Sequence, residues 1–257
     1  HANQYFGQRI TASIANNVWT RMKQMNIFIE EIEKHGLATE VTNPLKGQML
    51  FWRAWQYFEL LKLYGGVPLI LQAQNPIVDE GDKVNEIQRS SSSATLAQIE
   101  KDLDEAISLL PGTWPQAHWG RITSGAAAAF KGRVLLTWAS PQFNRNDDKA
   151  RWQKSYDANL AAKNLLEANG FGLHPSWDNM WFQQTDNDEA VIAVVFNSVS
   201  ADQTQRNNGW EAATRSKQTL GGGSISPTKQ MVDAFPMKDG KMPDDASGSY
   251  TYDPVKF

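Results

Sequence analysis

Aromatic rings and amides are the side chains whose type and spacing best fit a chemical role in this chain. Tryptophan is unusually frequent: there are ten, against six tyrosines and eleven phenylalanines. Flat apolar rings can cover the C–H face of a pyranose, and planar amides can bridge its hydroxyls. Tryptophans also fill large helical cores, so the composition points to sugars as a ligand class without locating a site.

Three of the tryptophans stand out as candidate ligand contacts. Trp210 lies in a polar segment without apolar periodicity, where a large ring is hard to explain as core. Trp177 and Trp181 are four residues apart and would share one face of a helical turn. The candidate glycan-binding residues are Trp210, Asn207, Asn208, Arg215, Trp177 and Trp181. Trp114 and Trp119, which flank a loop, could contact ligand or core.

Acidic residues raise the alternatives of catalysis and metal binding. Asp186, Asp188 and Glu189 follow an aromatic segment, and carboxylate pairs hydrolyse glycosides or, as oxygen ligands, hold calcium. The segment lacks the acidic spacing and the glycine of an EF-hand, so a turn leading into a strand is preferred and no metal is predicted. A second acidic group, on a predicted helix, is interpreted as a solvated face; it comprises Asp102, Asp104 and Glu105.

Other catalytic signals are weak, and neither a catalytic residue nor a cofactor is predicted. The four histidines have no metal-type spacing, and no Gly-x-Ser-x-Gly motif occurs. The run Gly221-Gly222-Gly223 lacks the lysine of a phosphate-binding loop. The absence of cysteine excludes disulfides and thiolate chemistry.

The length and the charge of the chain limit the kinds of partner that we expect. The 257 residues carry a formal charge of −3 with both signs interspersed, which gives no reason to expect nucleic acid. That length can bury a substantial core. No apolar run approaches the roughly 20 residues needed to span a bilayer.

Most of the elements that must position these side chains are predicted helices. Apolar residues recur at helical spacing over 10–35, 45–64, 94–110, 123–139 and 152–168. A strand is predicted over 190–196 and a short helix over 227–235. Pairing 45–64 with 94–110, and 123–139 with 151–169, predicts a mainly α fold of irregular tetratricopeptide-like helical hairpins, with long loops and a minor β element. Residues 1–196 would form the helical core and 197–257 a loop-rich segment packed on it.

Several motifs follow one another in a recognisable order over residues 14–241. They are Phe51-x-Arg53-Ala54-x-x-Tyr57-Phe58, Gly65-Gly66-Val67-Pro68, Asp102-Leu103, Gly120-Arg121-Ile122-Thr123, Ser140-Pro141-Gln142-Phe143-Asn144 and Met231-Val232-Asp233-Ala234-Phe235. The ordered set resembles the SusD/RagB family, the glycan-binding lipoproteins of the Bacteroidetes outer membrane.

The resemblance implies a fold and a function. It implies tetratricopeptide-like helical pairs, a buried paired charge at Arg53, a helix stop at Gly65-Gly66, and ligand sites on variable loops that no motif fixes. The implied function is non-catalytic: a lipid-anchored, surface-facing protein would deliver oligosaccharide to a TonB-dependent, SusC-like transporter. By the same comparison, this chain is expected to be a segment without the lipidated N-terminus and the C-terminal half.

Two other functions stay open at the level of sequence. One is an all-helical glycoside-active enzyme that uses Asp186 or Asp188. The other is a protein-binding tetratricopeptide scaffold, which would use a concave helical surface. Some relatives handle peptides, so the ligand class also stays open.

Overall fold

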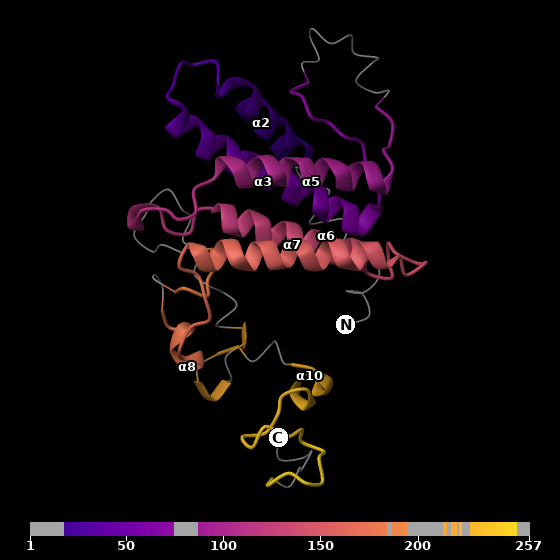
Figure 1. Cartoon of the computed structure of the whole chain (residues 1–257), viewed down its shortest axis with the longest axis vertical. Coiled ribbons are helices and arrows are strands. Elements are labelled where there is room, and N and C mark those ends of the chain that lie inside the picture. Colours follow the sequence, from indigo (N-terminus) through magenta and orange to yellow (C-terminus); the bar gives the residue numbers. More distant parts are fainter. Residues whose placement is uncertain are drawn as a thin grey trace. The chain divides into compact units, whose positions relative to one another are not determined.

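The computed structural model describes residues 18–74, 87–183, 187–194, 213–214, 217–219, 221–222 and 227–250. The chain divides into two compact units, residues 1–193 and 194–257. The helices of the first unit are α2 (Val18–Glu31), α3 (Thr39–Tyr64), α5 (Ser92–Leu109), α6 (Ser124–Ala139), α7 (Lys149–Ala168) and the short α8 (Trp177–Met180), with a 3₁₀ turn η2 (Gln116–His118) (Figure 1). In the second unit the structure describes η3 (Lys217–Thr219) and α10 (Lys229–Asp233).

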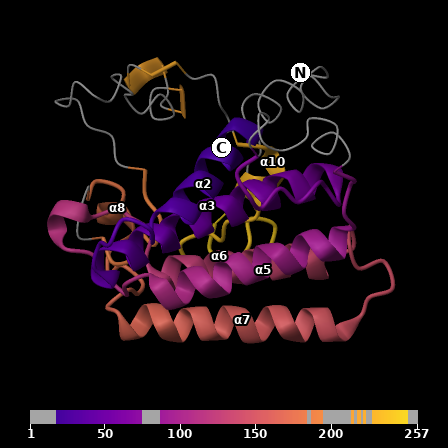
Figure 2. The same cartoon turned by 90° about the horizontal axis from the view of Figure 1, so that it is seen from above.

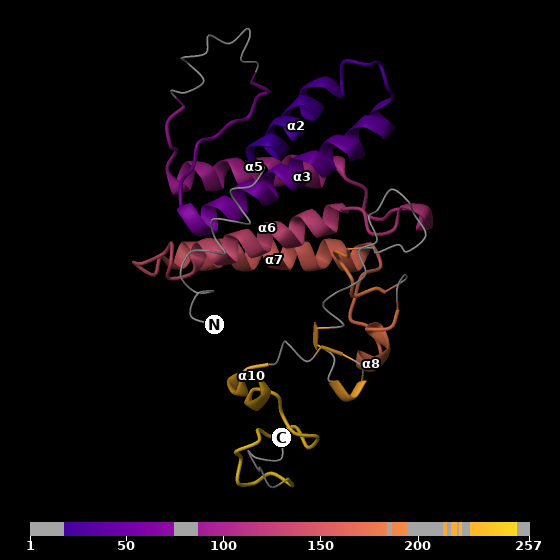
Figure 3. The same cartoon turned by 180° about the vertical axis from the view of Figure 1, so that it is seen from behind.

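The mainly α prediction is confirmed, and so are the predicted helical pairs. α3 packs along α5, and α6 packs along α7, with α5 on α6 and α2 on α3 linking them into one array. Opposite views show α6 and α7 side by side (Figures 1 and 3), and the view from above shows α7 at the edge of the array (Figure 2). No helix among the described residues is both long and apolar enough to cross a bilayer.

The predicted strand is wrong over its described part. Residues 190–194 follow a turn in which Ala190 N–H donates to Asn187 O at 3.0 Å. No strand is present among the described residues that could pair with this run. Val191 instead packs its side chain against the helical core. The β-branched composition therefore does not indicate strand pairing here: Val191 is half-buried, whereas Ile192 and Val194 are exposed.

Local sequence signals explain most helix boundaries. Ser91 and Thr123 cap α5 and α6, because their hydroxyls accept the N–H of Ala94 and Ala126 at 3.1 Å. α3 ends at the predicted glycine stop, where Gly65 adopts a φ of +70°. α3 begins earlier than predicted, at Thr39, and runs through Pro44.

A buried polar network joins four segments of the first unit. The Arg53 guanidinium on α3 donates two hydrogen bonds of 2.7 Å to the Asp102 carboxylate on α5. It also donates to Asn26 Oδ1 on α2 at 3.0 Å. The Asn26 amide and the Tyr57 hydroxyl both donate to the Ile70 carbonyl, at 2.9 and 3.0 Å. The network therefore fixes residues 70–72 against the helices.

This network confirms one sequence expectation and corrects another. Arg53 is a buried, paired charge, as the family resemblance implied. Asp102 was assigned to a solvated face, which is wrong: it is 1% exposed. It follows the buried Ile99 by three positions and precedes the buried Ala106 by four, so it lies on the packed face of α5. Asp104 and Glu105 do lie nearer the surface, in ion pairs with lysines.

Candidate ligand-binding site

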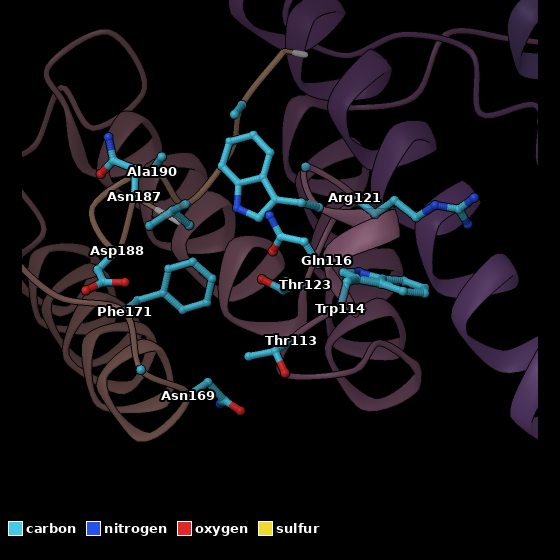
Figure 4. A pocket seen from close by; sticks show the side chains of 15 residues that line it. Thr113, Trp114, Gln116, Arg121, Thr123, Asn169, Phe171, Asn187, Asp188 and Ala190 are labelled. Atoms are coloured by element: carbon cyan, nitrogen blue, oxygen red, sulfur yellow. The ribbon is translucent and has the colours of Figure 1, made fainter. Parts of the chain in front are cut away.

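A pocket of about 200 Å³ lies in the first unit, between the loop that precedes α6 and the segment that follows α7. One wall comes from residues 113–123 and the other from residues 169–171 and 187–193. Figure 4 shows Gln116 on one wall directed toward Phe171 and Asp188 on the other, and Trp114 also lines the first wall. The pocket thus combines aromatic rings with polar groups.

The first wall is held in place by the approach to α6. The Trp114 indole N–H donates to Ile122 O at 2.8 Å, and the Arg121 guanidinium lies 5.4 Å from the centre of the same ring. Gly120 makes the tight turn between them with a φ of +88°. These contacts fix the half-buried indole before any ligand arrives.

The second wall begins at the end of α7. Gly170 has a φ of +85°, and Phe171 N–H donates back to Leu166 O at 3.1 Å, which is the hydrogen-bond pattern of a Schellman helix end. Gly170 is therefore the left-handed residue that ends α7. The turn places the ring of Phe171 between the two walls (Figure 4).

Asn187 stabilises the rest of the second wall. Its Oδ1 accepts Glu189 N–H at 3.1 Å, and its Nδ2 donates to Met180 O on α8 at 2.9 Å. Gly172 N–H donates to Asp188 O at 3.1 Å. Asn187 is therefore committed to holding the wall, and it ties the wall directly to α8.

Several polar side chains of the pocket are open to a ligand, and Asp188 and Gln116 are two of them. Asp188 and Gln116 are exposed, and neither makes a side-chain hydrogen bond or an ion pair with the described part of the chain. A carboxylate accepts hydrogen bonds from hydroxyl groups, and an amide both donates and accepts hydrogen bonds. Within the described part of the chain, Asp188 is the one carboxylate in the lining, and no group of three potential metal ligands occurs there.

Of the residues predicted from the sequence to bind glycan, the structure describes Trp177 and Trp181. Their rings lie 5.6 Å apart at an interplanar angle of 80°. They share a face of the α8 turn as their spacing predicted, and they are 65% and 66% exposed. Their contact with sugar stays a prediction. Trp210, Asn207, Asn208 and Arg215 lie outside the described residues, as does Asp186.

Sequence reasoning missed several residues of the pocket. Phe171, Gln116 and Asn187 were not predicted as site residues, and Asp188 was interpreted as part of a turn, which it is. The one sequence signal that could have helped was Gly170, because the left-handed turn at this glycine ends α7 and sets the direction of the Phe171 side chain. Trp114 and Trp119, left open between ligand and core, both line the pocket.

Known proteins agree with the fold and identify the family. A family model described as SusD-like, starch-binding associating with outer membrane, matches residues 3–136. No curated protein matches the chain. Among solved structures, a SusD-like protein from Bacteroides fragilis NCTC 9343 is 25% identical with a TM-score of 0.69, over 92% of this chain and 44% of that one.

Two further solved structures show the same fold. A SusD-like carbohydrate binding protein, also from Bacteroides fragilis NCTC 9343, is 20% identical with a TM-score of 0.71, over 91% of this chain and 42% of that one. A laminarin-binding SusD-like protein is 22% identical with a TM-score of 0.58, over 73% and 38%. This chain therefore spans less than half of their length. Because the matched model covers more than half of the 257 residues, the chain belongs to the SusD-like family, whose description is starch-binding and associating with the outer membrane.

Proposed function

We propose that this chain is part of a surface protein that binds oligosaccharide without cleaving it and delivers it to a TonB-dependent, SusC-like transporter. The observation that carries the binding step is the pair Trp177 and Trp181, two contacting indoles that are each about two-thirds exposed. The full-length protein would be lipid-anchored in the outer membrane and would face the cell exterior.

The exposed indoles of Trp177 and Trp181 are suited to bind the face of a sugar. Water-exposed indoles on a four-residue helix contribute little to the core, whereas covering one with the C–H face of a sugar removes apolar surface from water. Because the two rings are nearly perpendicular, one indole can lie flat against the face of a sugar while the other contacts the edge of the same sugar. Such open, wet contacts fit weak binding, with dissociation constants from about micromolar to millimolar.

The family supports the ligand class, and the pocket supports binding over catalysis. One matched structure carries laminarin binding in its description. Glycoside hydrolysis uses two carboxyl groups across the scissile bond, and among the described residues of the pocket lining Asp188 is the one carboxylate. Trp210, Asn207, Asn208 and Arg215 enter the proposal on sequence grounds, as further ligand contacts.

The test is calorimetric titration of this chain with a panel of neutral oligosaccharides cut from starch, laminarin and xyloglucan. The double variant Trp177→Ala/Trp181→Ala should weaken the best ligand at least about tenfold, or about 1.4 kcal/mol, with an unchanged melting temperature. Trp19→Ala is the matched control, since Trp19 is also exposed, at 40%, but lies on α2. Trp210→Ala should likewise weaken binding and leave stability unchanged.

Other outcomes would favour other functions. Equal binding by the double variant and the wild type would refute the role of the α8 pair. New reducing ends after incubation with the panel would favour a glycoside-active enzyme. Capture of a defined peptide, without binding to any glycan, would favour a protein-binding scaffold.

A further inference from the structure

We infer that the pocket between Trp114 and Phe171 is a second sugar subsite, which holds one uncharged pyranose of the same oligosaccharide that lies on the α8 pair. The inference rests on the proposed function, because it assumes that the ligand is a sugar. It adds a location, a minimum ligand length and a charge preference.

The size and the walls of the pocket fit one ring. A volume of about 200 Å³ is below the roughly 300–1,000 Å³ of sites for larger organic ligands. Trp114 belongs to one wall and Phe171 points in from the other (Figure 4). A pyranose has apolar C–H faces and a rim of hydroxyls, so its faces suit the aromatic walls and its rim suits polar groups at the edge.

The free polar groups suit hydroxyls. Asp188 offers an unpaired carboxylate, which accepts from a hydroxyl in a charge-assisted bond, and Gln116 offers an amide on the opposite wall (Figure 4). Asn187 has both amide atoms engaged and is a positioning residue. The recognition is therefore assigned to Asp188 and Gln116, with Thr113 and Arg121 as further exposed polar residues of the lining.

The charge arrangement disfavours acidic sugars. Among the described residues of the lining, Asp188 is the one anionic side chain and Arg121 the one cationic side chain. The Arg121 guanidinium lies over the Trp114 ring on the other wall, and Figure 4 shows it directed away from Asp188. A uronate or sulfate entering beside Asp188 would meet a like charge without a neighbouring cation. A neutral hydroxymethyl group would meet an acceptor.

The pocket and the α8 pair are neighbours within the first unit. Asn187 lines the pocket, and its Nδ2 donates to the carbonyl of Met180, the residue before Trp181. The Asn187 side chain thus links the pocket wall to the α8 turn that carries the exposed indoles. An oligosaccharide with one ring in the pocket can lay its next rings on Trp181 and Trp177, so affinity should rise with chain length.

The test uses a length series of one neutral oligosaccharide, from a disaccharide to a hexasaccharide, titrated into the 257-residue chain. Asp188→Asn and Gln116→Ala should each weaken the hexasaccharide about tenfold without lowering the melting temperature. Asp157→Asn is the matched control, an exposed carboxylate on α7, about 18 Å along the helix from Asn169. Affinity of the wild type should increase with length, and the Trp177→Ala/Trp181→Ala variant should flatten that increase.

Charge preference is tested with the same hexasaccharide after oxidation of its C6 hydroxymethyl groups to carboxylates. The wild type should bind the oxidised form about fivefold less tightly, and Asp188→Asn should reduce this difference. Equal or tighter binding of the oxidised form would overturn the inference. So would normal hexasaccharide binding by both pocket variants, while a loss in the α8 variant alone would leave the proposed function standing. No binding by any sugar would overturn both.

Discussion

Breaking the buried pair Arg53–Asp102 should be among the most damaging single changes to this chain. In Asp102→Ala the guanidinium loses both 2.7 Å hydrogen bonds and its counter-charge. Arg53 is only 7% exposed, so water cannot readily replace them. The remaining acceptors near Arg53 are the side-chain oxygen of Asn26 and the carbonyl of Leu71, at 3.0 and 3.5 Å. Both are neutral and cannot balance the charge.

The magnitude follows from burial. Removing one partner of a buried ion pair costs about 3–5 kcal/mol, because the other charge is left uncompensated. Domains are stable by only about 5–15 kcal/mol, so this loss is a large share of the total. At about 2–4 °C per kcal/mol for a unit of this size, the melting temperature should fall by roughly 6–20 °C.

The assay is chemical denaturation followed by circular dichroism. Glu167→Ala is the control, because the Lys163–Glu167 pair has a similar 2.7 Å contact but is exposed; it should cost under about 0.5 kcal/mol. The double variant Arg53→Met/Asp102→Leu should recover part of the loss, since it removes both charges. A cost for Asp102→Ala no greater than that of the control would refute the reasoning.

Three further predictions concern stability. Burial raises the pKa of Tyr57 to about 12, against about 10 when unfolded, so its contribution should be complete below pH 10 and decline by about 2–3 kcal/mol as the pH rises through 12; Tyr57→Phe should remove this alkaline decline in pH-dependent denaturation. A methyl group on Gly66 would lie 1.8 Å from the carbonyl oxygen of Ser90, so Gly66→Ala should lower the melting temperature, while Gly172→Ala, with open space around it, should not. Ser91→Ala removes the cap of α5 and should cost about 1 kcal/mol in thermal denaturation; an unchanged melting temperature would contradict the cap's role.

Sequence periodicity was enough to predict the helices and their pairing. Ile99, Leu103 and Ala106 recur at helical spacing and are all buried on α5, and the hydroxyl caps mark where α5 and α6 begin. Asp102 was wrongly predicted to face solvent because the prediction relied on its charge. Its position along the helix places it on the same buried face of α5 as Ile99 and Ala106. The strand over 190–196 was predicted from composition, and a short run of β-branched residues cannot tell a strand from an irregular segment.

The candidate site was harder to predict because it lies in loops. Trp177 and Trp181 could be placed together, since a four-residue spacing on a helical turn brings side chains onto one face. The pocket depends on contacts between residues far apart in sequence, such as Gly172 with Asp188 and Trp114 with Ile122. No period links these positions, so only the assembled chain shows that Phe171 and Trp114 line the same pocket.

The placement of the pocket at one end of the α6–α7 pair has a consequence for the order of folding. Only residues 140–148 join α6 to α7, whereas residues 65–91 separate α3 from α5. Closing the shorter connection costs less chain entropy, and local contacts form sooner. We expect the α6–α7 hairpin to form first and the Arg53–Asp102 pair to close later. The two segments that carry Trp114 and Phe171 adjoin the ends of the early hairpin, so the frame of the pocket would be set before α3 and α5 come together.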